Sequence, residues 1–316
     1  MPFCPVCNYD SKMSLHYYPK EMMIGKRIQF EYINCKTCNC LFINGVPIEL
    51  EEYYLDYYTA KKKYFQISGI TGYLWKIRTI FTLNGLYPVV RLFRKNSILQ
   101  WLSYLNLSLT DPILDVGCGN GDILYEFNKH GFKKLYGVDP YPPPVSSGTF
   151  NWEFIRGDIF SIVNRKFKLI MFNHSLEHTF EHSKILNRAK ELLIDDGRIM
   201  IRMPVVNKAF EDYKENWAQL DAPRHLLIHS KLSFEKLCYD LDLEVYKILY
   251  DSTEFQFMGS IQYGKDITYY DPESYKISTT GGMFSTLEIK KYKTLAKQYN
   301  KLGLGDQAAF FLKPVK

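Results

Sequence analysis

The stretch Leu114-Asp115-Val116-Gly117-Cys118-Gly119-Asn120-Gly121-Asp122 decides the fold of this chain. A short apolar run ends in an acid, and three alternating glycines then let the backbone turn sharply beside a ligand. A helix-like segment follows, and a second apolar strand ends in Asp139. The pattern predicts a strand, turn, helix and strand, with the second acid placed to hydrogen-bond the two hydroxyls of a ribose.

The spacing of the three glycines indicates which class of ligand binds at the turn. Dinucleotide-binding enzymes favour G-x-G-x-x-G, in which a helix N-terminus faces a pyrophosphate. This chain has G-x-G-x-G, and Asp115 before it would repel a phosphate but suits a ligand with an ammonium group. S-adenosylmethionine (SAM) has an ammonium, a sulfonium and a ribose diol, and it has no phosphate. We therefore expect SAM to bind at this turn.

The composition is that of an ordinary soluble protein, with 316 residues, 46% hydrophobic and 23% charged. No apolar run approaches the length of a membrane span, and the N-terminus has no basic and apolar leader, so we expect a cytoplasmic protein. The net charge of +6 is compatible with an anionic substrate but does not require nucleic acid.

Two C-x-x-C pairs lie near the N-terminus, Cys4 with Cys7 and Cys35 with Cys38. Two such pairs supply the four thiolates of a tetrahedral zinc site, and a site with four protein ligands is closed and structural. Residues 1–47 are therefore predicted to form a zinc ribbon that depends on Zn²⁺ for folding. Cys40 is a fifth candidate that could replace Cys38 as a ligand, although the C-x-x-C spacing favours Cys35 and Cys38.

The remaining chain alternates between strand and helix patterns. Strands are expected near 112–116, 133–139, 152–155, 167–173, 198–203, 243–250 and 308–314, and an apolar helix before the fifth is expected to end at Gly197. This predicts an α/β fold, a doubly wound, mostly parallel, seven-stranded Rossmann-like sheet at 111–316, with an insert at about 251–306.

Residues 48–110 are predicted to be a helical connector. A helix is expected at 48–60, and the basic and aromatic residues 61–110 are expected to form helices that cover the ligand cleft. An interfacial surface in peripheral contact with a membrane is the alternative.

Two further strand ends carry candidate ligand residues. Asp158 follows the third strand and is placed to accept a hydrogen bond from an adenine amine, with Ile159 packed on the ring; a helix-capping role for Asp158 is the alternative. Asn173 and His174 follow the fourth strand, near the methionine part of the ligand and the incoming acceptor.

These motifs resemble the motif series of class I SAM-dependent methyltransferases. Together with the cysteine ribbon and the stretch from Trp217 to Leu226, they resemble bacterial members that modify sugars of polysaccharides, lipopolysaccharides or antibiotics. The resemblance implies SAM as methyl donor. It also implies a small-molecule acceptor, such as a hydroxyl of a sugar or nucleotide-linked sugar in surface-glycan or secondary-metabolite synthesis. The implied SAM-binding residues are Asp115, Gly117, Cys118, Gly119, Gly121, Asp139, Asp158, Ile159, Asn173 and His174. Sugar C-methylating relatives are longer, so C-methylation does not follow.

A sugar hydroxyl is a poor nucleophile at neutral pH, so a general base is expected. His225 is the first candidate and His178 the second, with Glu177 as its partner; purely structural roles for both histidines are the alternative. Arg202 and Arg224 are candidates for pairing with an anionic substrate or with nearby acids.

Two other classes of function stay open. The first is an RNA or protein methyltransferase in which the ribbon and the connector hold a macromolecule; exocyclic base amines are disfavoured, because Asn173-His174-Ser175-Leu176 stands where those enzymes carry Pro-Pro-aromatic. The second is a binding protein with a relic SAM site.

Overall fold

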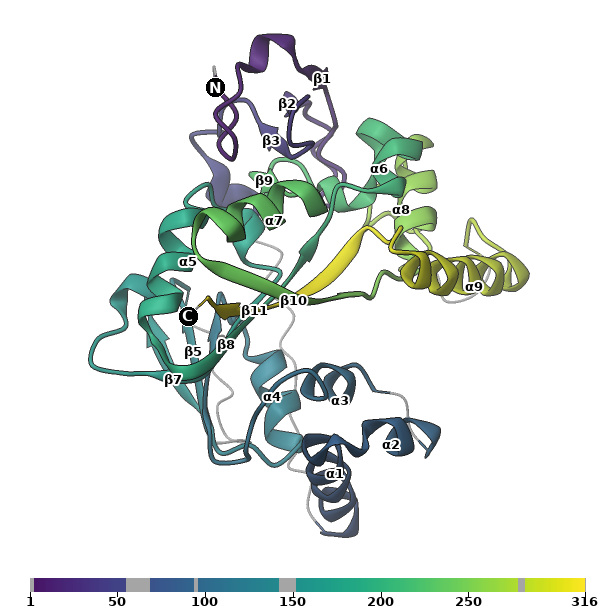
Figure 1. Ribbon diagram of the computed structural model, residues 1–316. Helices are drawn as coiled ribbons and strands as arrows, with labels where there is room; N and C mark the ends of the chain where they lie inside the picture. The colour runs from purple at the N-terminus through teal and green to yellow at the C-terminus, as the bar shows by residue number, and fades with distance from the viewer. Residues whose placement is uncertain (1–2, 55–68, 94–95, 142–151, 278–281, 316) are drawn as a thin grey trace.

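A seven-stranded sheet forms the centre of the computed structural model, which describes residues 3–54, 69–93, 96–141, 152–277 and 282–315. Its strand order is β10-β11-β8-β7-β4-β5-β6, and β11 is the strand that runs antiparallel to its neighbours (Figure 1). The strands are β4 (Pro112–Val116), β5 (Lys134–Asp139), β6 (Glu153–Arg156), β7 (Phe167–Asn173), β8 (Leu193–Pro204), β10 (Leu243–Tyr250) and β11 (Gln307–Pro314). The predicted Rossmann-like fold class is confirmed.

Helices cover both faces of this sheet, because both faces of its central strands are apolar. In β4, Leu114 packs in a core with α5 and α7, whereas its neighbour Ile113 packs in a second core with α3 and α4. The α-helices are α1 (Gly69–Phe81), α2 (Tyr87–Phe93), α3 (Ser97–Leu102), α4 (Asp122–Lys129), α5 (His182–Glu191), α6 (Lys208–Tyr213), α7 (Lys231–Asp240), α8 (Phe255–Gly264) and α9 (Thr286–Leu302).

Short helical turns connect several of these elements. The 3-10 turns span Ser11–Met13, Leu50–Tyr53, Ile159–Ser161, Leu176–His178, Lys214–Asn216 and Ala218–Leu220, and a π-helical turn spans Thr82–Leu86.

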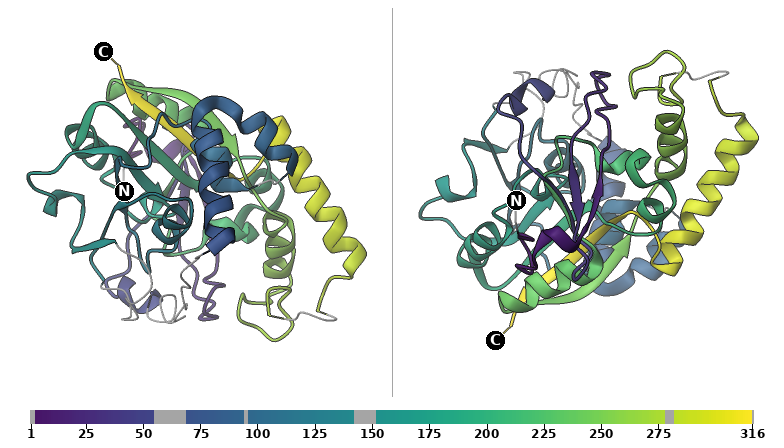
Figure 2. Two further views of the ribbon diagram at one scale, coloured as in Figure 1. Left: turned by 90° about the horizontal axis from the view of Figure 1, so that it is seen from below. Right: turned by 90° about the horizontal axis from the view of Figure 1, so that it is seen from above.

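A second, antiparallel sheet holds the N-terminal segment, with the order β1-β2-β3-β9. Strands β1 (Leu15–Tyr17), β2 (Tyr32–Asn34) and β3 (Leu41–Ile43) come from the predicted ribbon, but β9 (Leu227–Ile228) comes from the main domain. Seen from above, the ribbon lies across the top of the molecule (Figure 2). The ribbon is therefore joined to the main domain by backbone pairing with β9.

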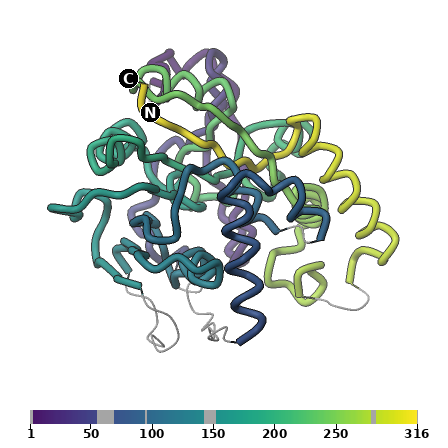
Figure 3. The backbone as a smooth tube through the Cα atoms, turned by 60° about the horizontal axis from the view of Figure 1, so that its bottom comes forward, coloured from purple at the N-terminus to yellow at the C-terminus, as the bar shows by residue number. Residues whose placement is uncertain are grey.

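The predicted insert lies between β10 and β11. Its helices α8 and α9 pack against each other, and α9 runs along the outer side of α8 (Figure 3). The side chain of Ser260 in α8 accepts a hydrogen bond from Ala218 N at 3.0 Å, so the insert supports the loop that leads to His225. Among the described residues, we find no helix with both the length and the apolar character of a membrane span.

Two local predictions differ from the structure. The helix expected to end at Gly197 ends at Glu191, and β8 already begins at Leu193. Gly197 lies inside that strand, where a Cβ would come within 2.8 Å of the Leu193 side chain, so close packing explains the glycine. Of the helix expected at 48–60, the described part is only the 3-10 turn Leu50–Tyr53; residues 55–60 lie outside the described part of the chain.

The connector helices also differ from expectation in their position. Helices α1, α2 and α3 pack near α4 on one face of the sheet (Figure 1). Of the connector residues that the structure describes, those that line the large cavity lie at 48–54, next to Val46 and Pro47 at the end of the predicted ribbon.

Candidate active site

A cavity of about 750 Å³ opens at the carboxyl ends of β4, β5 and β7. The glycine turn forms one wall. Gly117 has φ +73°, and a Cβ there would lie 2.4 Å from Cβ of Ser175, so only glycine fits both the backbone and the space. The hydroxyl of Ser175 donates to the carbonyl of Val116 at 2.6 Å and locks the turn against the end of β7. The predicted turn therefore lines a cavity large enough for a nucleoside ligand.

Two acids lie beneath and beside this turn. Asp139 accepts hydrogen bonds from Gly119 N and Tyr141 N, both at 2.9 Å, which fixes its carboxylate at the cavity wall. Asp115 is buried, and its Oδ1 has no hydrogen-bond partner. Burial and the neighbouring charge of Asp139 raise the pKa of Asp115 to about 8. A cation bound at this turn would relieve both costs.

A smaller cavity of about 260 Å³ lies beyond the turn and includes Asp158 and Ile159 in its lining. Asp158 accepts from Phe160 N at 3.0 Å and Ser161 N at 3.2 Å, so it caps the turn Ile159–Ser161. The capping role is therefore present. Contact of Asp158 with adenine stays a prediction, compatible with its place in this cavity.

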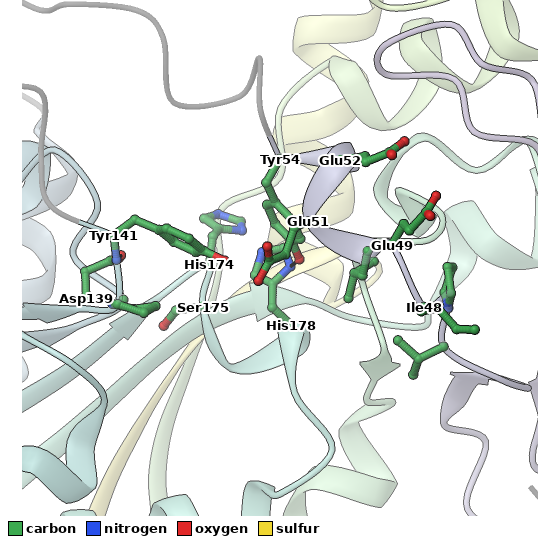
Figure 4. A pocket seen from close by; sticks show the side chains of 15 residues that line it. Ile48, Glu49, Glu51, Glu52, Tyr54, Asp139, Tyr141, His174, Ser175 and His178 are labelled. Atoms are coloured by element: carbon green, nitrogen blue, oxygen red, sulfur yellow. Dashed lines mark hydrogen bonds between the residues drawn. The ribbon is translucent and has the colours of Figure 1, made fainter.

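The segment from Val46 to Tyr54 closes the larger cavity from the ribbon side (Figure 4). Glu51 points toward Tyr141 and His178, whereas Glu52 points away from them. The hydroxyl of Tyr54 lies 3.0 Å from Nδ1 of His178. No local pattern in the sequence indicates that this segment lines the cavity, because the residues that it meets there, such as His178, are far away in the chain.

A further cavity of about 250 Å³ adjoins the first, and His174 and His178 line both of them. Its other lining residues are amides, hydroxyls, charged groups and aromatic rings: Gln219, Asp221, His225, Thr253, Phe255, Tyr269, Lys276 and Gln307, with Met23 and Ala218. It is therefore a polar chamber beside the predicted SAM cavity.

We call Glu177, His178 and His225 the acceptor cluster. His178 lines both cavities, His225 lines the smaller one, and the fully buried Glu177 lines neither. One carboxylate oxygen and one nitrogen from each ring lie within 4.8 Å of one another. Glu177 is fully buried; burial alone would raise its pKa, but the hydrogen bond from His174 and the nearby histidine charges hold the pKa at about 2. Its Oε2 has no hydrogen-bond partner.

The hydrogen bonds of the histidines fix their tautomers. His178 donates from Nδ1 to the carbonyl of Arg224 at 2.9 Å, and His225 donates from Nδ1 to the carbonyl of Gln219 at 2.8 Å. In the neutral rings, Nε2 is therefore the basic nitrogen. Nε2 of His225 lies 3.9 Å from Oε1 of Glu177 and 3.7 Å from Oδ2 of Asp221. Burial lowers the pKa of His225 to about 4.

The two arginines pair with acids of the chain itself. Arg224 is fully buried and pairs with Asp221. It also pairs with Glu21, at 3.4 Å between nitrogen and oxygen, and donates to the carbonyl of Tyr53 at 3.1 Å. Glu21 also accepts three backbone N–H groups of the ribbon. Of the two roles expected for Arg224, the structure shows pairing with nearby acids.

Arg202 joins the end of β8 to the cavity wall. It pairs with Asp251 at 2.7 Å and donates to Nε2 of His174 at 2.6 Å, so His174 donates from Nδ1 to Glu177 at 3.3 Å. This series of contacts, from Asp251 through Arg202 and His174, holds the Glu177 carboxylate in place. Asn173 accepts weakly from Arg202 at 3.4 Å.

The predicted metal ligands come together in the ribbon. The four sulfurs of Cys4, Cys7, Cys35 and Cys38 lie within 4.8 Å of one another, with Cys4–Cys38 at 3.6 Å and Cys7–Cys35 at 3.5 Å. A tetrahedral zinc with bonds of about 2.3 Å separates its sulfurs by roughly 3.8 Å, so the four thiols fit such an ion. Cys40 adds a fifth sulfur, 3.4 Å from Cys4.

Residues 90–248, half of the chain, match a family model described as "Methyltransferase domain". The chain belongs to this methyltransferase family. With its seven-stranded sheet and glycine turn, it is a class I SAM-dependent methyltransferase, and SAM is its methyl donor.

Relatives match over short stretches. EEF1A lysine methyltransferase 2 of Mus musculus is 30% identical over 88 residues, covering 28% of this chain and 30% of that protein. A putative protein N5-glutamine methyltransferase of Methanocaldococcus jannaschii is 33% identical over 107 residues, covering 32% of this chain and 54% of that protein. The matches thus span about a third and about half of those proteins. A solved SAM-dependent methyltransferase from Archaeoglobus fulgidus is 15% identical, with a TM-score of 0.43, covering 76% of this chain and 98% of that one.

The predicted SAM-binding residues divide by position. Gly117, Asp139 and His174 line the large cavity, and Asp158 and Ile159 line the one beyond it. The others line neither cavity: Asp115, Cys118, Gly119, Gly121 and Asn173. Cys118 is buried, and its sulfur packs close to Gly137.

Proposed function

We propose that this methyltransferase transfers a methyl group from SAM to a hydroxyl of a small-molecule acceptor, a sugar or nucleotide-linked sugar of surface-glycan or secondary-metabolite synthesis. One observation carries the proposal: the predicted SAM cavity and a separate polar chamber share His174 and His178 in their linings. An acceptor in the chamber would present its hydroxyl at that boundary.

The chamber suits a sugar. Gln219, Asp221 and Gln307 offer donors and acceptors to hydroxyl groups, and the rings of Phe255 and Tyr269 offer flat apolar faces. Lys276, in the same lining, would attract a diphosphate. Hydroxyls, an apolar ring face and a diphosphate are the recognition elements of a nucleotide sugar.

The acceptor cluster would take up the hydroxyl proton. Bound SAM supplies a sulfonium methyl group, whose S–C bond breaks as the new C–O bond forms in line. His178 is the better-placed base of the two histidines, because it faces both cavities while its Nδ1–H is fixed by the carbonyl of Arg224. His225, at 5% exposure, lies deeper. A positioned base contributes about 10²–10⁴-fold to the rate.

Labelled SAM with a panel of nucleotide sugars tests the proposal. We expect label on one nucleotide sugar, and we expect His178→Gln to lower turnover strongly while calorimetric SAM binding stays unchanged. Full turnover of His178→Gln would exclude His178 as base. Label on no sugar, with SAM binding intact, would exclude this class of acceptor.

Protein methylation is the second candidate, favoured by the lysine and glutamine methyltransferases among the relatives. In this case the chamber would receive a side chain presented by a protein. The same labelled reaction, run with cell protein and with total RNA, separates the candidates: label on protein supports this alternative, and RNA retention that weakens steeply with salt would indicate phosphate contacts.

A further inference from the structure

The acceptor cluster contains more lone pairs than hydrogens to satisfy them. Because His225 donates from Nδ1 to Gln219, the Nε2 that faces Glu177 and Asp221 carries a lone pair. Glu177 adds a second carboxylate oxygen, Oε2, that is buried without a hydrogen-bond partner. A positive centre among these lone pairs would stabilise the arrangement.

The surrounding charges also leave room for a cation. Glu21 and Glu177 are buried, and the side chain of Asp221 is 10% exposed. One buried guanidinium, that of Arg224, pairs with Glu21 and Asp221. Arg202 reaches Glu177 only through His174. The Glu177 carboxylate is therefore the one buried acid of this group without a cationic partner in direct contact.

In both histidines, the hydrogen bond from Nδ1 is of the kind that metal-binding histidines make with their other ring nitrogen. A ligating histidine donates its other ring N–H to a carbonyl or carboxylate, which fixes the ring and leaves a lone pair for the metal. His178 does this with the carbonyl of Arg224, and His225 does it with the carbonyl of Gln219.

We propose that Glu177, His178 and His225 bind a divalent cation of the Mn²⁺ or Fe²⁺ type as a two-histidine, one-carboxylate site. Such a site leaves coordination positions open, and here they would face the polar chamber. Metal–ligand bonds of about 2.1 Å place ligand atoms roughly 3–4 Å apart, so the 3.9 Å between His225 Nε2 and Glu177 Oε1 requires only a small closure.

The inference rests on the proposed function for its role in catalysis. With the cation bound, His178 would be a metal ligand in place of the general base proposed above. The cation would hold the acceptor hydroxyl oxygen in an open position and lower the pKa of that hydroxyl, and the proton would pass to water. The zinc ribbon is a separate site, because four thiols favour zinc whereas carboxylate and imidazole accept harder cations.

Mn²⁺ titrated into the zinc-loaded, SAM-free protein tests this site, with free Mn²⁺ followed by electron paramagnetic resonance. We expect one Mn²⁺ per chain, at least tenfold weaker binding in Glu177→Gln and in His225→Gln, and unchanged binding in Glu244→Gln, a control at a surface acid paired with Lys313. Absence of a site in the wild type, or binding unaffected by Glu177→Gln, would overturn the proposal.

Pulsed resonance spectra of the bound Mn²⁺ need no variant and serve if a substitution prevents folding. Couplings to histidine nitrogen would support the site, and their absence would overturn it. The two proposals fail separately. If the protein methylates a sugar but binds no Mn²⁺, the cation site is refuted and the proposed function stands. If it binds Mn²⁺ but methylates no sugar, the cation site stands and the sugar acceptor is refuted.

Discussion

Tyr32 of the ribbon donates its hydroxyl hydrogen to the carbonyl oxygen of His225 over 2.7 Å, and both residues are buried. Close by, Ser230 donates to the carbonyl of Cys38, a predicted zinc ligand, over 2.7 Å, and β3 pairs with β9. The ribbon and the loop that carries His225 therefore form one hydrogen-bonded unit. We therefore expect the ribbon to position His225, through the contacts that it makes with the backbone of this loop.

Tyr32→Phe should lower methyl transfer more than SAM binding. The substitution leaves the buried carbonyl of His225 without its partner, at a cost of about 1–3 kcal/mol, while the glycine turn is untouched. Calorimetry with SAM and a turnover assay measure the two effects. Tyr18→Phe, which removes only an exposed contact to Glu31 at 3.4 Å, is the matched control. Equal turnover of the two variants would contradict the positioning role.

The ribbon should bind one zinc per chain, and Cys4→Ser should lose it. Because the ribbon buries little apolar surface of its own, zinc loss should unfold it and loosen β9, which reduces turnover together with stability. Metal analysis and thermal melting measure both. Cys238→Ser changes a buried thiol in the main domain and should keep the zinc. A full zinc content in Cys4→Ser would show that Cys40 can replace this ligand.

The sheet could be predicted from the sequence because its signals are local. The strand–turn–helix unit around Gly117 and the acid at Asp139 follow from residues close together in the chain, as do the two C-x-x-C pairs. The end of α5 could not be predicted, because Leu193 belongs equally to an apolar helix stripe and to the start of β8.

The acceptor side of the site could be predicted only in part. His178 and Glu177 were identifiable from their position after β7, and the structure brings His225 beside them. Residues 46–54 cover a cavity whose other walls come from distant parts of the chain, and Arg224 pairs with Glu21 across about 200 residues. No local pattern in the sequence encodes such contacts.

Gly117→Ala should abolish SAM binding. The new Cβ would lie 2.4 Å from Cβ of Ser175, so the turn and the end of β7 must separate at the cavity wall. Gly85→Ala is the control: its φ of +82° is similar, but a Cβ there meets nothing within 4 Å, so it should show only the backbone cost of about 1–2 kcal/mol. SAM affinity by calorimetry separates the two. Retention of SAM binding by Gly117→Ala would mean that the turn is not the binding site.

Asp115→Asn should change how the stability of the SAM-free protein depends on pH. The folded pKa of Asp115 is raised from 3.8 to about 8, so the folded state keeps a proton that the unfolded state loses. Stability from this group is complete below about pH 4 and is lost as the pH rises toward 8, by at most about 1.4 kcal/mol per pH unit. Asp115→Asn has no such loss of stability. The difference in the free energy of unfolding between Asp115→Asn and the wild type, measured by denaturant melts, should therefore increase in favour of the variant between pH 5 and pH 8. Saturating SAM, whose ammonium would compensate the ionised Asp115, should shrink that advantage. Parallel pH profiles of the two proteins without SAM would show that Asp115 is already ionised in the folded state.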